Sequence, residues 1–190
     1  MTTTLRARMQ RVLVIGAGGS GKTAFALRLA ERTGLPLVHL DALYWRPGWV
    51  ATPPEEWRAL VEGLVARPSW IMDGNYGGTL DLRLDAADAV VFLDLPRTLC
   101  LWRVLTRRLR TRGRNRPELP SDCPERLGWE FVAWIWTYPS RRRPDILRRL
   151  APVRDAKQVT VLSSASEVEA FLAGVPKVSG RSSLTPGSRS

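Results

Sequence analysis

A chain of 190 residues is long enough for one domain with a sizeable hydrophobic core and too short for two ordinary domains. Hydrophobic residues make up 44% and charged residues 25%, and no apolar run approaches the roughly 18 residues that would span a bilayer. The net charge is +11, and most of it falls in residues 97–149, which carry fourteen arginines against five acidic residues. We expect a cytoplasmic protein with no membrane segment. A basic block of this kind can serve nucleic acid, a membrane surface or a polyphosphate ligand.

The spacing of apolar residues predicts strands that alternate with helices. Strands are expected over 11–17, 35–40, 70–73, 89–95 and 158–162. Helices are expected over 23–32, 53–66, 97–110, 124–138, 144–150 and 167–173, with Pro139 separating the fourth from the fifth. This alternation predicts an α/β fold, a three-layer sandwich in which helices cover both faces of a five-stranded parallel sheet.

Two segments do not follow the alternation. Residues 111–124 are rich in Arg, Pro, Asn and Gly, so a basic loop is expected there. Residues 176–190 are rich in Ser and Gly and are expected to be a disordered tail. The sequence therefore predicts one domain over residues 1–175 with an Arg-rich lid at about 111–124.

A glycine-rich motif follows the first predicted strand and precedes the first predicted helix. The segment 16–23, Gly-Ala-Gly-Gly-Ser-Gly-Lys-Thr, matches the phosphate-binding pattern G-x-x-x-x-G-K-[ST]. In this motif glycines let backbone N–H groups wrap a phosphate, the lysine reaches the β- and γ-phosphates, and the hydroxyl of the last residue ligates Mg²⁺. ATP and Mg²⁺ are therefore the expected cofactors. The residues expected to bind them are Gly16, Gly18, Gly19, Ser20, Gly21, Lys22 and Thr23.

The same glycines also fit the dinucleotide fingerprint G-x-G-x-x-G. Asp41 even stands at about the distance of the acid that binds the ribose in that fold. Lys22 and Thr23 argue against this interpretation, because a dinucleotide loop does not call for a lysine there. An NAD-binding oxidoreductase remains a remote alternative.

Three aspartates stand at predicted strand ends, where open parallel sheets bind ligands. Phosphoryl transfer needs an acid to hold Mg²⁺ and often another to accept the proton of the attacking hydroxyl. We assign Asp73 to the Mg²⁺ side with Thr23, and keep Asp94 as the alternative or as a helix cap. Asp41 is the expected acceptor ligand or base, and the nearby His39 is expected to be structural.

Aromatic residues are expected on the acceptor side of the site. Tyr44, Trp45, Trp49 and Trp57 are candidates to line an acceptor pocket, although tryptophans more often pack in cores.

The basic block contains arginines suited to a transferring phosphoryl group, whose charge spreads over several oxygens. Arg103 and Arg107 lie on one face of a predicted helix, and Arg114 and Arg116 follow in the lid. The alternative is a nucleic-acid surface on which tryptophans stack. We do not favour it, because the tryptophans of segment 129–136 show the spacing of the core face of a helix.

Four segments together resemble a known family. Residues 16–23, 39–49, 70–76 and 92–97 occur in the order seen in the bacterial P-loop proteins called DNA topology modulation proteins, or FlaR-like proteins, which are similar to adenylate kinase. The resemblance covers about residues 11–175 and implies a P-loop kinase fold with an arginine-bearing lid. Adenylate kinases continue Asp-Gly with Phe-Pro-Arg, whereas this chain reads Asn75-Tyr76-Gly77. The arginine that would grip an acceptor phosphate is therefore missing, unless Arg83 replaces it.

The sequence thus predicts a kinase that transfers the ATP γ-phosphate to a small acceptor, with nucleotides among the candidates. The alternative is a nucleic-acid-associated ATPase regulator, as the family name suggests, but no groove-reading motif is present in the sequence.

Overall fold

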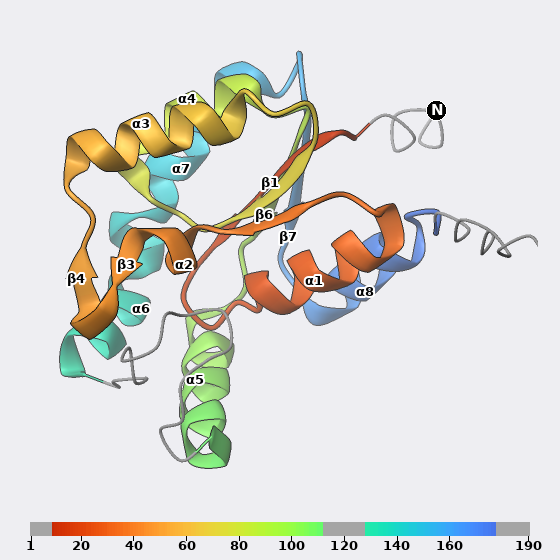
Figure 1. Cartoon of the computed structure of the whole chain (residues 1–190). Coiled ribbons are helices and arrows are strands. Elements are labelled where there is room, and N and C mark those ends of the chain that lie inside the picture. The colour runs from red at the N-terminus through yellow and green to blue at the C-terminus, as the bar shows by residue number, and fades with distance from the viewer. Residues whose placement is uncertain (1–8, 112–127, 178–190) are drawn as a thin grey trace, which may run out of the picture.

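Five parallel strands form the centre of the protein in a computed structural model, which describes residues 9–111 and 128–177 (Figure 1). Their order across the sheet is β2, β5, β1, β6 and β7. All four neighbouring pairs run parallel. The strands span Arg11–Gly16 (β1), Leu37–His39 (β2), Trp70–Asp73 (β5), Ala89–Leu93 (β6) and Gln158–Leu162 (β7).

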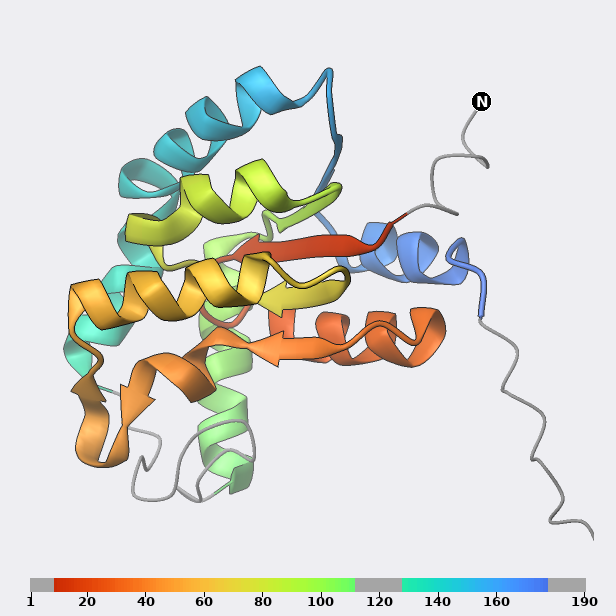
Figure 2. The same cartoon turned by 45° about the horizontal axis from the view of Figure 1, so that its top comes forward.

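Helices cover both faces of this sheet (Figures 1 and 2). One face carries α1 (Lys22–Thr33) and α8 (Ala165–Ala173). The other carries α3 (Pro54–Val65), α4 (Leu80–Ala86) and α7 (Arg143–Leu150). Because β1 is buried on both sides, its sequence is a continuous apolar run rather than an alternating one. Val12 and Val14 pack into one core with α1 and α8, whereas Leu13 and Ile15 pack into the other.

The predicted α/β fold with a five-stranded parallel sheet is confirmed. In chain order the strands of the main sheet lie 2-3-1-4-5, so the second strand is separated from the P-loop strand by β5. A dinucleotide-binding fold has the order 3-2-1-4-5-6, in which the second strand lies beside the first and presents the ribose-binding acid. Asp41, which follows β2, therefore does not occupy that position, and the NAD alternative is wrong.

Smaller elements gather at the carboxyl ends of the strands. They are α2 (Leu40–Tyr44), a hairpin of β3 (Trp45–Arg46) and β4 (Val50–Ala51), and the longer helices α5 (Arg97–Thr111) and α6 (Trp129–Arg141). A 3₁₀ turn, Pro47–Trp49, joins the two strands of the hairpin. Figure 1 shows α5 projecting away from the sheet below the strand ends. These elements surround the glycine-rich segment that follows β1. No helix within residues 9–111 and 128–177 is long and apolar enough to cross a membrane.

Some sequence-based expectations differ from the structure. The second strand ends at His39, because Leu40 already begins α2. Pro139 does not end a helix: it lies in the last turns of α6, where it removes one backbone hydrogen bond, and the chain turns into α7 at Arg142. Trp129 is 81% exposed and Trp136 is 47% exposed, so these two tryptophans are not part of a core face.

Other expectations fall on residues outside the described part of the chain. These are the lid, apart from Thr111 at the end of α5, and nearly all of the tail predicted over 176–190.

Candidate active site

The glycine-rich segment forms a tight loop between β1 and the start of α1. Gly19 and Gly21 have φ angles of 78° and 89°, a left-handed conformation that glycine adopts without strain. A Cβ atom on Gly19 would lie 2.3 Å from the carbonyl oxygen of Cys100 in α5. The glycines are therefore required by backbone geometry and by the close approach of α5.

The N-terminus of α1 points its backbone amides at this loop. Within the described residues, the helix has no side-chain N-cap and no acidic residue in its first turn. Its first N–H groups and its positive dipole end are thus available to an anion. The Lys22 ammonium donates to the carbonyl oxygen of Ala17 across the loop, at 3.0 Å. Loop, helix end and ammonium together form a cradle suited to phosphates.

Asp73 lies directly beside this cradle. The sheet register pairs Asp73 with Val14 of β1 on one side and with His39 of β2 on the other. Its Oδ2 accepts a hydrogen bond from the Thr23 hydroxyl at 2.7 Å and lies 3.3 Å from Nδ1 of His39. Its Oδ1 is buried and has no hydrogen-bond partner within the described residues. A hydroxyl and a carboxylate with an unsatisfied oxygen fit the oxygen ligands that Mg²⁺ prefers.

Asp94 is engaged elsewhere. Arg143 of α7 donates from Nε to both of its carboxylate oxygens, at 3.0 and 2.8 Å. The Thr23 hydroxyl is bonded to Asp73 and not to Asp94. Of the two acids considered for the Mg²⁺ side, the geometry therefore favours Asp73.

Helix α5 brings arginines to the loop. Nη1 of Arg103 donates to the carbonyl oxygen of Ser20 at 3.1 Å. Arg107 lies one turn further along the helix and is half-buried. Arg114 and Arg116, the predicted lid arginines, lie outside the described residues.

Asp41 belongs to a second group of side chains, which follows the carboxyl end of β2. Its Oδ1 accepts a hydrogen bond from the Tyr76 hydroxyl at 2.6 Å. Burial, followed by the nearby Asp41 charge, raises the pKa of Tyr76 far above its ordinary value, so the hydroxyl stays protonated and donates. Tyr44 and Trp57 lie against Tyr76, with ring centroids 4.5 and 4.9 Å from its ring.

Trp57 is 5% exposed and belongs to the core. The other two candidate pocket tryptophans, Trp45 and Trp49, are more exposed. Trp45 packs edge-on against Tyr44 at 4.9 Å and against Trp49 at 5.3 Å. Both are half-buried and continue the aromatic surface toward the hairpin.

Asn75 is a functional candidate that sequence reasoning missed. Its side chain accepts from the Gly16 N–H at 3.0 Å and donates to the Gly16 carbonyl at 2.7 Å. It thereby fastens the segment after β5 to the first residue of the phosphate-binding loop. Its place directly after Asp73-Gly74 was the only available signal.

Arg83 of α4 does not offer its charge to a ligand. The residue is 0% exposed, and its guanidinium donates to the backbone carbonyls of Thr79, Gly74, Asn75 and Tyr76. Burial lowers the pKa of Arg83 to about 10. It therefore holds residues 74–79 in place and does not replace the missing acceptor-binding arginine.

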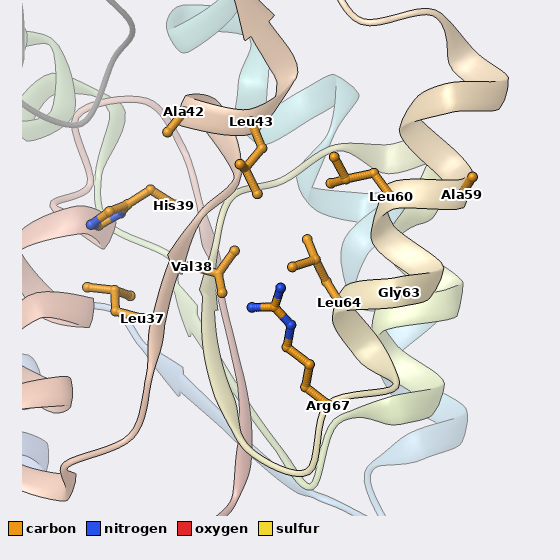
Figure 3. Close-up of a pocket in the computed structure, with 10 residues that line it drawn as sticks. All are labelled: Leu37, Val38, His39, Ala42, Leu43, Ala59, Leu60, Gly63, Leu64 and Arg67. Carbon is orange, nitrogen blue, oxygen red and sulfur yellow. The ribbon is translucent and has the colours of Figure 1, made fainter.

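A cavity of about 540 Å³ lies between the edge strand β2, α2 and α3, and His39, which contacts Asp73, is among the residues that line it (Figure 3). Val38, Leu43, Leu60 and Leu64 give it an apolar lining, and the Arg67 side chain extends into it. None of the predicted site residues lines this cavity.

A P-loop that follows the central strand of a 2-3-1-4-5 parallel sheet defines a kinase-like P-loop fold. The structure is similar to shikimate kinase from Acinetobacter baumannii in complex with shikimate, with a TM-score of 0.55 and 18% identity over 87% of this chain and 90% of that one. A sugar kinase from Janibacter sp. HTCC2649 (20% identity, 87% of this chain and 93% of that one) and a gluconokinase from Sinorhizobium meliloti 1021 (19%, 87% and 91%) have TM-scores of 0.49.

Two matches were found by comparison of the sequence with known proteins. A sequence model of the isopentenyl transferase family matches residues 9–45, the segment that contains β1, the P-loop, α1 and β2. The chain is also 30% identical to the uncharacterized protein YqaC of Bacillus subtilis (strain 168) over 133 residues, which are 68% of this chain and 72% of that protein. The chain belongs to the same family as YqaC.

Proposed function

We propose that this protein is a kinase that transfers the γ-phosphate of Mg-ATP to a small acceptor molecule. The observation that carries this proposal is the pair Thr23 and Asp73, joined by a 2.7 Å hydrogen bond beside the phosphate cradle. A P-loop hydroxyl and a carboxylate from the neighbouring strand are the groups that hold Mg²⁺ next to nucleotide phosphates in P-loop proteins. Thr23 and Asp73 would hold the ion when it is bound, and it would supply positive charge against the phosphates.

Each remaining group has a role in this reaction. The amides of Gly16–Thr23 and the Lys22 ammonium hold the β- and γ-phosphates. Arg103, with Arg107 one turn beyond it, stabilises the charge on the transferring group. We assign the same role to Arg114 and Arg116 on the basis of the sequence alone. Asp41 contacts the acceptor.

A second part of the proposal concerns the family and the cellular location of the protein. We propose that the protein is FlaR-like, because residues 16–23, 39–49, 70–76 and 92–97 follow one another as in that family. We also propose that it acts in the cytoplasm. An adenylate kinase-like reaction would need a different grip on the acceptor, because Arg83 is buried.

A nucleic-acid-associated ATPase is the second candidate. The observation that favours it is the exposure of Trp102, at 65% on the arginine-rich helix α5, and of Trp129, at 81% at the start of α6. Arg97 stacks over the exposed Trp136 ring at 3.9 Å. This function predicts ATP hydrolysis stimulated by DNA, and DNA binding that weakens steeply with salt.

The Lys22→Ala variant tests the kinase proposal. Removing one charge-assisted contact to phosphate is worth about 1.5–3 kcal/mol, so ATP affinity should fall by about 10- to 100-fold. Isothermal titration with Mg-AMP-PNP measures this, and Lys177→Ala, a substitution of an exposed lysine far along the chain, is the matched control. Unchanged affinity in Lys22→Ala would refute the proposed role of the loop.

A further inference from the structure

The acceptor side of the site is built from Asp41 and aromatic rings, and it differs in charge from the nucleotide side. The Asp41 carboxylate lies at the start of α2, directly after β2, and is half-buried. Its hydrogen bond from Tyr76 fixes one of its two oxygens and leaves the other to a substrate. A carboxylate in this position repels an acceptor phosphate and accepts a hydrogen bond from an acceptor hydroxyl.

Within residues 9–111 and 128–177, three arginines with bonds to the acceptor-side segments, Arg83, Arg46 and Arg149, are already engaged. The guanidinium of Arg83 donates to four backbone carbonyls. Arg46 in the hairpin donates to both carboxylate oxygens of Glu56 at 2.5 Å. Arg149 of α7 pairs with Asp81 at 2.9 Å and also bonds to Asp145. A phosphate that bound to any of these three arginines would have to displace a carboxylate or carbonyl first.

The backbone at Tyr76 is strained, and contacts with neighbouring residues hold it in this conformation. Tyr76 has φ 31° and ψ 73°, a left-handed conformation that is costly for a residue with a side chain. Arg83 fixes the carbonyls of residues 74–76, and Asn75 fastens the same segment to Gly16. Strained backbone that is held by several contacts is typical of functional sites. Here it orients the Tyr76 hydroxyl, and this hydroxyl in turn orients Asp41.

Among the neighbouring aromatic residues, Tyr44, Trp45 and Trp49 are half-buried, so part of each ring remains exposed and could contact a flat or cyclic molecule. Tyr44 packs on Tyr76 and Trp57, and Trp45 and Trp49 continue the group toward the hairpin. Such rings supply contact area and weak polar interactions with C–H edges, without charge.

From these contacts we infer that the acceptor is an uncharged, ring-containing hydroxyl compound, of the nucleoside or sugar class, and not a nucleoside monophosphate. This inference rests on the proposed kinase function and narrows its substrate. The acceptor hydroxyl oxygen forms a bond to the γ-phosphorus, and the bond from that phosphorus to the β,γ-bridging oxygen breaks, so that ADP leaves with the electron pair. The hydroxyl proton passes to the Asp41 carboxylate and then to water.

A bisubstrate analogue tests the inference directly. Diadenosine pentaphosphate spans a nucleotide site and a neighbouring nucleoside monophosphate site, whereas AMP-PNP fills only the first. The inference predicts that the analogue binds no more than about threefold tighter than AMP-PNP in the presence of Mg²⁺. A gain of about 100-fold, or tight binding of AMP or thymidine monophosphate to the protein saturated with AMP-PNP, would overturn it. If AMP-PNP itself does not bind, the kinase proposal falls and this inference falls with it.

Matched acceptors complete the test. ADP release from Mg-ATP is measured with adenosine, thymidine and glucose and with their monophosphates. Stimulation by a neutral compound and not by its phosphorylated partner supports the inference, and the reverse contradicts it. Asp41→Asn should then lower kcat by about 100-fold or more while AMP-PNP affinity stays within about threefold, as expected for loss of a general base. Asp155→Asn, a change at an exposed aspartate, is the control.

Discussion

The Asn75 clamp on the phosphate-binding loop gives the sharpest stability prediction. Asn75→Ala removes two hydrogen bonds, one from the Gly16 N–H at 3.0 Å and one to the Gly16 carbonyl at 2.7 Å. Each such bond contributes about 1 kcal/mol net, so the free energy of unfolding should fall by about 2 kcal/mol. For a chain of this size that corresponds to a drop of about 4–8 °C in Tm.

Urea unfolding followed by circular dichroism measures the loss, and titration with Mg-AMP-PNP measures the effect on the loop. Asn75→Asp is the informative companion, because it keeps an acceptor for the Gly16 N–H but sets a negative charge against the Gly16 carbonyl and near the phosphates. We expect Asn75→Asp to bind nucleotide more weakly than Asn75→Ala. A stability change below about 0.5 kcal/mol in Asn75→Ala would refute the clamp, since that is the range of ordinary surface substitutions.

Two further predictions concern backbone space and pH. Gly19→Ala places a Cβ 2.3 Å from a carbonyl oxygen of α5 at a φ of 78°, so a loss of about 3 kcal/mol or more in unfolding free energy, or failure to fold, is expected. Gly63→Ala, in α3 with nothing within 4 Å, should instead be neutral or stabilise by up to about 1 kcal/mol; equal effects of the two would contradict the loop geometry. Burial raises the pKa of Tyr76 and of Tyr138. Above about pH 10 the unfolded state therefore loses these two protons while the folded state keeps them. As the pH rises further, each tyrosine lowers the free energy of unfolding by about 1.4 kcal/mol per pH unit. Absorbance at 295 nm should show these two phenols ionising only on unfolding, and their ionisation in the native protein would disprove their burial.

Much of the fold follows from local patterns. The five main strands are apolar runs between turn residues, and the three central ones, β5, β1 and β6, are buried on both faces, which produces continuous apolar runs. The site motif is local too, because the loop, its lysine and its hydroxyl are consecutive residues. Asp73 could be predicted beside the loop because it ends the strand that pairs with β1.

The remaining features depend on contacts between distant residues. The hairpin strands β3 and β4 have two residues each, which is too short for any period to show. Arginines are rarely fully buried, so nothing in the sequence marked Arg83 as the residue that holds residues 74–79. Asp94 and Arg143 are 49 positions apart, and only the folded chain shows that they pair. Trp129 has helical spacing with core residues, yet it lies in the first turn of α6, where no described element covers it.

The most direct test of the account is whether Mg²⁺ strengthens nucleotide binding through Asp73. Titration of AMP-PNP into the native protein, with and without Mg²⁺, should show a gain in affinity with the ion of about tenfold or more, because the ion offsets phosphate charge beside Thr23 and Asp73. Asp73→Asn should retain binding without the ion and lose most of that gain. If the gain is the same in the variant, or if the native protein binds no nucleotide, the site proposed here is not a Mg-ATP site.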